Sequence, residues 1–105
     1  MSERSRVIAG AAYFPAIDEL LLAAIGQGAW WNGARCRVSQ VDNLADATIT
    51  TTDERFTDHP VRRERWRLLA SRASVARSWG DCFGYLMVAT GRAEVMADPV
   101  LSAWD

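Results

Sequence analysis

Lysine is absent from this sequence, since all 12 basic side chains among its 105 residues are arginines. A lysine nucleophile, a Schiff-base lysine and the lysine of a phosphate-binding loop are therefore excluded. Histidine is nearly absent too: His59 is the only one, and no Gly-x-Ser-x-Gly motif accompanies it, which argues against a Ser-His-Asp triad. Metalloprotease, EF-hand, Walker and dinucleotide-binding motifs are also missing.

Long apolar runs and export signals are missing as well. The longest apolar stretches, Leu20–Ile25 and Leu86–Ala89, fall far short of the ~20 residues that span a bilayer. The basic N-terminus is not followed by a sustained apolar run, so it does not resemble a signal peptide. We therefore expect a cytoplasmic protein with no membrane partner.

Cysteine is scarce, with only Cys36 and Cys82, and these lack CxxC spacing. In a reducing compartment the preferred interpretation is two small buried hydrophobic residues, although a disulfide between them stays open. An excess of basic charge is also lacking, because 12 basic and 13 acidic side chains give a net charge of −1. This balance argues against a nucleic-acid partner.

Short strands and turn signals fill residues 1–40. Val7–Tyr13 is small and β-branched and ends at Phe14-Pro15, which predicts a strand followed by a turn. Asn32-Gly33 predicts a two-residue hairpin turn, because both central residues of such a turn need positive φ. We expect an antiparallel meander of three or four strands here, without a helix to cover either face.

Residues 41–105 alternate between strand and helix patterns. We predict strands at Ala47–Thr52, Val75–Trp79 and Ala93–Ala97, because these segments are rich in β-branched and small apolar residues. Alternation with helices predicts a layered α/β unit. The predicted fold class is therefore α/β with an α+β character, in one domain whose halves are 1–40 and 41–105.

Two helices are expected between these strands. The first is capped by Asp58, has Pro60 in its first turn, and carries an apolar stripe at helical spacing. Its stripe consists of Trp66, Leu69, Ala70 and Ala73. The second helix, residues 82–90, is apolar on every face, which predicts burial, with Asp81 as its N-cap and Gly91 as its C-terminal glycine.

Arginines lie mostly off the stripe of the first helix. These residues are Arg62, Arg63, Arg65, Arg67 and Arg72. We interpret them as a solvated face in preference to an anion-binding patch.

Carboxylates at the ends of predicted elements are the candidate functional groups. Gly80, Asp81 and Cys82 open the second helix, whose free backbone N–H groups can hold a polar ligand. Asp98 closes the last strand, and Asp105 follows a further apolar stretch. From spacing alone, the favoured interpretations are Asp81 as a plain helix cap and Asp98 as a plain turn residue.

Six segments, in this order, resemble the inositol monophosphatase superfamily of Mg²⁺-dependent phosphomonoesterases. They are Val-Ile-Ala-Gly-Ala-Ala-Tyr-Phe-Pro-Ala-Ile-Asp-Glu (7–19), Gly-Gln-Gly-Ala-Trp-Trp-Asn-Gly (26–33), Arg-Cys-Arg-Val-Ser (35–39), Arg-Ser-Trp-Gly-Asp-Cys-Phe-Gly-Tyr (77–85), Val-Ala-Thr-Gly-Arg-Ala-Glu (88–94) and Trp-Asp (104–105). The Gly-Asp-Cys-Phe-Gly-Tyr segment is most similar to the histidinol-phosphate phosphatase branch.

The resemblance implies part of the inositol monophosphatase (sugar-phosphatase) fold. It also implies that Gly80, Asp81, Cys82 and Asp98 contact the substrate, a small phosphorylated metabolite. The carboxylates of Asp81 and Asp98 would suit the cationic amino-alcohol part of that substrate. Asp105 would be a Mg²⁺ ligand.

The sequence departs from the family in two places. The first metal-binding segment, with its Asp-Pro-Ile-Asp-Gly-Thr run, is absent, and the second stops at Asp105. One carboxylate holds Mg²⁺ poorly. We therefore expect a fragment of a phosphoric monoester hydrolase that supplies a substrate-recognition wall and one metal ligand but is inactive alone. The alternative is a non-catalytic assembly module that forms a homo-oligomer, and a complementing half from another chain is a third possibility.

Overall fold

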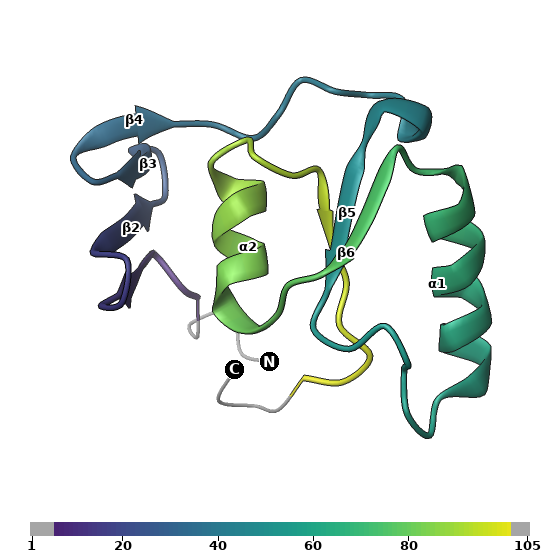
Figure 1. Cartoon of the computed structure of the whole chain (residues 1–105). Coiled ribbons are helices and arrows are strands. Elements are labelled where there is room, and N and C mark those ends of the chain that lie inside the picture. The colour runs from purple at the N-terminus through teal and green to yellow at the C-terminus, as the bar shows by residue number, and fades with distance from the viewer. Residues whose placement is uncertain (1–5, 102–105) are drawn as a thin grey trace. The chain divides into compact units, whose positions relative to one another are not determined.

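The structure is a computed structural model, and it describes residues 6–101. The chain divides into two compact units, which we call unit 1 (residues up to Arg37) and unit 2 (residues from Val38 on). Figure 1 shows the elements of both, and each unit is described on its own below.

Unit 1 is a four-stranded antiparallel sheet in which the strands follow one another in chain order. Its strands are β1 (Ala9–Phe14), β2 (Glu19–Ala24), β3 (Gly28–Trp31) and β4 (Ala34–Cys36). The predicted meander is confirmed, because turn residues interrupt the apolar sequence often enough to fold it back on itself three times.

The predicted Asn32-Gly33 turn joins β3 to β4, with φ of 48° at Asn32 and 82° at Gly33. The Asn32 side chain also accepts a hydrogen bond from the Leu20 N–H at 2.7 Å and donates one to the Asp18 carbonyl at 3.3 Å. Asn32 therefore forms one turn and fixes the neighbouring β1–β2 turn at the same end of the sheet.

Unit 1 has no buried residue among positions 6–37. Large apolar side chains on its strands, including Tyr13, Leu22 and Trp30, remain exposed. A sheet without a covered face gains little from apolar burial, so its described residues do not form a hydrophobic core of their own.

Unit 2 is a layered α/β structure built on a three-stranded parallel sheet in the order β6-β5-β7. Its elements are β5 (Thr48–Thr51), α1 (Pro60–Arg72), β6 (Val75–Ser78), α2 (Asp81–Ala89) and β7 (Val95–Met96). The predicted alternation of strand and helix is confirmed. The helices α1 and α2 lie on opposite faces of the sheet (Figure 1).

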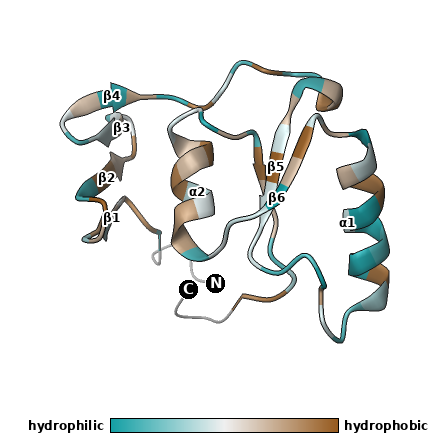
Figure 2. Ribbon diagram, viewed as in Figure 1, coloured by the Kyte–Doolittle hydropathy of each residue, from teal (hydrophilic) through white to brown (hydrophobic). Residues whose placement is uncertain are grey.

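The core of unit 2 lies where α1 packs on the central strand β5. Ile49, Phe56 and Trp66 are buried there, and the rings of Phe56 and Trp66 stack with their centroids 5.8 Å apart. Leu69, Ala70 and Ala73 pack against this core, which confirms the predicted apolar stripe. The arginines of α1 are exposed, as predicted, and α1 is the most hydrophilic element of unit 2 in Figure 2.

Both helices have a different N-cap residue from the one predicted, whereas the glycine predicted after the second helix is found. His59, not Asp58, occupies the N-cap position of α1, because Asp58 adopts φ of 64° in the preceding turn. Gly80, not Asp81, is the N-cap of α2. Gly91 has φ of 79° directly after the C-cap, so the glycine prediction is confirmed.

The prediction that the second helix is buried all round is wrong for unit 2. Only Gly84 and Leu86 are buried in α2, while Cys82 and Tyr85 are exposed. The reason is that unit 2 contacts only one face of the helix. Cys82 is therefore not the buried hydrophobic residue expected, Cys36 is half-buried, and both thiols are free. None of the described helices is long and apolar enough to cross a membrane.

Removing the Trp66 ring is expected to destabilise unit 2 strongly. Trp66→Ala empties the space beside Phe56, and such substitutions cost about 3–5 kcal/mol in free energy of unfolding. Leu68→Ala is the matched control, since Leu68 lies on the same helix and is 54% exposed. Urea unfolding followed by circular dichroism measures both. A Trp66→Ala midpoint equal to that of Leu68→Ala would contradict the packing described here.

Candidate functional site

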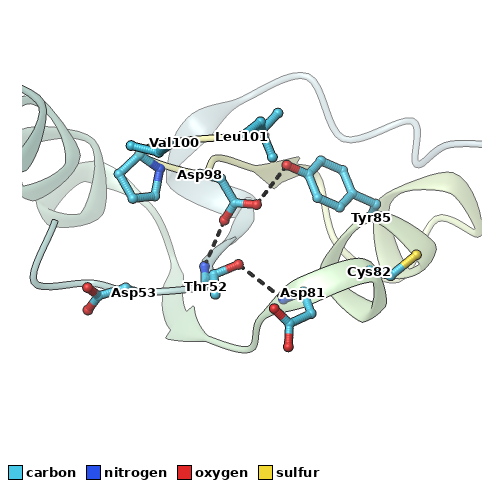
Figure 3. A pocket seen from close by; sticks show the side chains of 9 residues that line it. Thr52, Asp53, Asp81, Cys82, Tyr85, Asp98, Val100 and Leu101 are labelled. Atoms are coloured by element: carbon cyan, nitrogen blue, oxygen red, sulfur yellow. Dashed lines mark hydrogen bonds between the residues drawn. The ribbon is translucent and has the colours of Figure 1, made fainter. Parts of the chain in front are cut away.

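A cavity of about 650 Å³ lies at the carboxyl edge of the unit 2 sheet, where the segments after β5, β6 and β7 meet. Parallel sheets bind ligands at this edge, because the loops that leave the strands converge there. The residues that line the cavity are Thr52, Asp53, Asp81, Cys82, Tyr85, Asp98, Pro99, Val100 and Leu101. Their side chains are drawn in Figure 3.

The Asp98 carboxylate joins the segments after β5 and β7. One oxygen accepts a hydrogen bond from the Thr52 N–H at 3.1 Å, and the other accepts one from the Tyr85 hydroxyl at 2.9 Å. Figure 3 shows Asp98 between these two donors. Because both oxygens have a partner, the Asp98 carboxyl group is held in one orientation at the cavity.

The turn between β6 and α2 packs directly on Thr52. A Cβ atom added at Gly80 would lie 2.9 Å from the Thr52 Cα and 2.8 Å from its methyl carbon, so only glycine fits. The next residue, Asp81, donates its N–H to the Thr52 hydroxyl at 3.0 Å and adopts φ of 55°. A left-handed conformation is uncommon for a non-glycine residue, and such strain clusters at functional sites.

Carboxylates dominate the charge of the cavity. Asp53, Asp81 and Asp98 line it, and none of the described lining residues is basic. Asp53 accepts hydrogen bonds from the Arg55 N–H and the Thr57 hydroxyl, at 3.0 and 3.3 Å. Within residues 6–101, the Asp81 carboxylate has no hydrogen-bond partner. The arrangement is suited to a cationic group and unsuited to a phosphate.

A Mg²⁺ site requires several oxygen ligands in octahedral order. Within residues 6–101 there is no cluster of three or more acidic, histidine or cysteine side chains that could hold a metal ion. The predicted ligand Asp105 lies outside the described residues. The described residues therefore do not fit a bound Mg²⁺ ion, and no step through a metal is derived from them.

Most of the predicted substrate contacts come together in this one place. Asp81, Cys82 and Asp98 line the cavity, and Gly80 packs on the Thr52 backbone at its edge. Their role toward a substrate stays a prediction.

Sequence patterns did not point to three further cavity residues. Thr52 and Asp53 lie in no motif, and Tyr85 ends the Gly-Asp-Cys-Phe-Gly-Tyr segment but was not assigned a role of its own. The available signal was topological: Thr52 and Asp53 directly follow the central parallel strand, so they had to reach the same edge as Asp98.

Proteins named histidinol-phosphatase are among those similar to this chain. The sequence profile of the inositol monophosphatase family matches residues 1–105. A protein named histidinol-phosphatase from Chlorobaculum parvum is 38% identical over 96 residues, which cover 91% of this chain and 37% of that protein. A histidinol-phosphatase from Mycobacterium tuberculosis is 33% identical over 101 residues, with 91% and 39% coverage.

Solved structures share the fold. The extragenic suppressor protein SuhB from Bartonella henselae superposes with a TM-score of 0.87 at 32% identity, over 97% of this chain and 40% of that one. An inositol monophosphatase from Anabaena gives 0.80 at 26% identity, over 93% and 41%. These matches confirm the predicted fold. The chain spans about two fifths of the length of the relatives it matches.

Adding a single methyl group at Gly80 is expected to disturb both stability and the cavity. Gly80→Ala places Cβ against the Thr52 backbone, and such overpacking costs about 1–3 kcal/mol in free energy of unfolding. Gly10→Ala is the control, because a Cβ there meets nothing within 4 Å. Urea unfolding gives the energies, and an NMR spectrum shows whether the Thr52 and Asp81 amide signals move. Equal stability of the two variants would contradict the close contact.

Proposed function

Because the chain belongs to the inositol monophosphatase family, we propose that it is the substrate-recognition part of a Mg²⁺-dependent phosphomonoesterase resembling histidinol-phosphate phosphatase. The observation that carries the proposal is the carboxylate-lined cavity, which has no basic residue among its described lining residues. The substrate would be a small phosphorylated metabolite with a cationic group, consistent with the names of the histidinol-phosphatases it resembles.

Each of the four predicted substrate contacts has a role in this proposal. The Asp81 carboxylate binds the ammonium group, since within the described residues it has no hydrogen-bond partner. Asp98 adds a second negative charge, oriented by Thr52 and Tyr85. Cys82 forms part of the wall, and Gly80 lets the turn approach closely enough to place Asp81. Opposite charges at such short range favour binding and set the orientation of the ligand.

Phosphate hydrolysis is assigned to groups other than the described residues. Metal-assisted hydrolysis needs ions that activate water and stabilise the leaving oxygen. Residues 6–101 provide no metal cluster, and the resemblance assigns only Asp105 as a ligand. We therefore propose that this chain alone binds the organic part of the substrate without hydrolysing the phosphate ester.

The chain is expected to bind histidinol, the amino alcohol without its phosphate, and Asp81→Asn is expected to weaken that binding about tenfold. The reason is the loss of the negative charge from one charge-assisted contact, and a tenfold change corresponds to about 1.4 kcal/mol. Isothermal titration calorimetry measures the dissociation constants. Glu54→Gln is the matched control, because Glu54 is an exposed acid on the same loop as Asp53 but does not line the cavity.

Two results would overturn the proposal. If Asp81→Asn and Glu54→Gln bound histidinol equally tightly, the cavity would not be the binding site for histidinol. Mg²⁺-dependent phosphate release from histidinol phosphate, abolished by Asp105→Asn, would show that the chain assembles a complete metal site.

A second candidate function, a self-associating assembly module, is favoured by the exposed apolar surface of unit 1. No residue among positions 6–37 is buried, and the edge strand β1 pairs on only one side. Unpaired edges and large apolar faces promote association. A homo-oligomer without catalytic function would cover them, and so would a separate polypeptide that supplies a complementing half.

Purified alone, the chain is expected to sediment as an oligomer, and Leu22→Arg is expected to shift it toward the monomer. Leu22 is exposed on β2, so a charge there opposes the burial of that face. Leu68→Arg places the same charge on exposed α1 and serves as the control. Sedimentation velocity at several concentrations measures the distribution. A purely monomeric wild-type chain would exclude the assembly module and leave the complementing half.

A further inference from the structure

The segment that follows β7 forms one wall of the cavity, and it is held mainly at its start. The Ala97 N–H donates to the Thr50 carbonyl at 3.0 Å, and Asp98 accepts the two hydrogen bonds described above. Further on, Val100 and Leu101 line the cavity but are 59% and 61% exposed. Burial therefore contributes little to their position, and a segment of this kind is free to move unless a polar contact fixes it.

Arg62 provides such a polar contact. Its guanidinium group donates a hydrogen bond from Nη1 to the carbonyl oxygen of Pro99. Proline has no N–H, so this carbonyl is the only backbone group of Pro99 that can be held by a hydrogen bond. The bond is charge-assisted, and such bonds are stronger than those between neutral groups.

The position of Arg62 makes it a firm anchor. It lies in the first turn of α1, and Trp66, one turn further on, is buried in the core of unit 2. Because Trp66 fixes α1 to the core, the backbone of Arg62 is fixed as well. Arg62 is not among the residues that line the cavity, so its effect on a ligand would pass through Pro99.

The other α1 arginines make no such contact within the described residues. Arg67 pairs with Glu64 on the helix surface at 3.2 Å. Arg63 is the adjacent residue and is also exposed to solvent, but within the described residues it has no hydrogen bond to the segment after β7. Arg63 is therefore a matched control, since its substitution removes the same charge from the same helical turn.

We propose that Arg62 is a positioning residue that fixes the wall formed by Pro99, Val100 and Leu101 and so sets the affinity of the cavity for its ligand. This inference rests on the proposed function, in which the cavity takes the cationic part of a small substrate. The proposed chemistry is indirect, because the guanidinium group orders a backbone segment and the ordered segment excludes water from the carboxylates. Lower exposure to water strengthens the attraction between a carboxylate and an ammonium group.

The test compares Arg62→Gln, Arg62→Lys and Arg63→Gln in the full 105-residue chain, with histidinol as the probe. Arg62→Gln is expected to weaken histidinol binding about fivefold, consistent with the loss of one ordering hydrogen bond. Arg62→Lys keeps a long, charged donor, unlike the shorter and neutral Gln amide, and is expected to restore most of the affinity, whereas Arg63→Gln is expected to leave it unchanged. Urea midpoints of all three variants should equal that of the wild type.

A second measurement keeps the inference separate from the proposed function. Backbone ¹⁵N relaxation reports motion of Val100 and Leu101 on the picosecond to nanosecond timescale without any ligand. Lower order parameters at both residues in Arg62→Gln, and not in Arg63→Gln, would support the positioning role even if the wild-type chain failed to bind histidinol. Unchanged order parameters in Arg62→Gln would overturn it, and so would histidinol binding as tight as in Arg63→Gln.

Discussion

The pairing of β5 with a parallel strand on each side is the constraint on which unit 2 depends. Parallel strands all point their carboxyl ends to one edge, so the segments that leave β5, β6 and β7 must meet there. Asp53, Asp81 and Asp98 are far apart in the sequence and reach one cavity for this reason alone. The same pairing buries Ile49 and Thr51 completely, which ties the integrity of the cavity to the integrity of the core.

The side chains that line the cavity at this edge also stabilise the fold. The Asp98 carboxylate holds the backbone of Thr52 and the hydroxyl of Tyr85, so it contributes to the fold as well as to the negative potential of the cavity. Asp81 differs, because its backbone is held by Thr52 in a left-handed conformation while its carboxylate has no hydrogen-bond partner among the described residues. Conformational strain of this kind is retained where surrounding contacts over-determine it.

Local signals in the sequence predicted the elements well, and tertiary contacts decided the rest. Asn32 and Gly91 were found because positive φ restricts the residue type, and the Trp66 stripe because a helix repeats every 3.6 residues. Asp81 was predicted to be the N-cap, but it is the first residue of α2 and Gly80 is the N-cap. The reason is that the close approach of Gly80 to Thr52 sets this turn, and no local sequence pattern records that contact. Tyr85 likewise needed the strand order, since its partner Asp98 lies 13 residues away.

The long separation between β5 and β7 has a kinetic consequence. The two strands pair residues that are 46 positions apart, Ile49 with Val95 and Thr50 with Met96. Loop-closure entropy makes such contacts slow to form, whereas the turns and helices between them form early. The wall after β7 is therefore expected to be added at the end of folding. An intermediate of unit 2 that lacks β7 would contain β5, β6, α1 and α2 but no complete cavity. Ligand binding would therefore report the last step in the folding of unit 2.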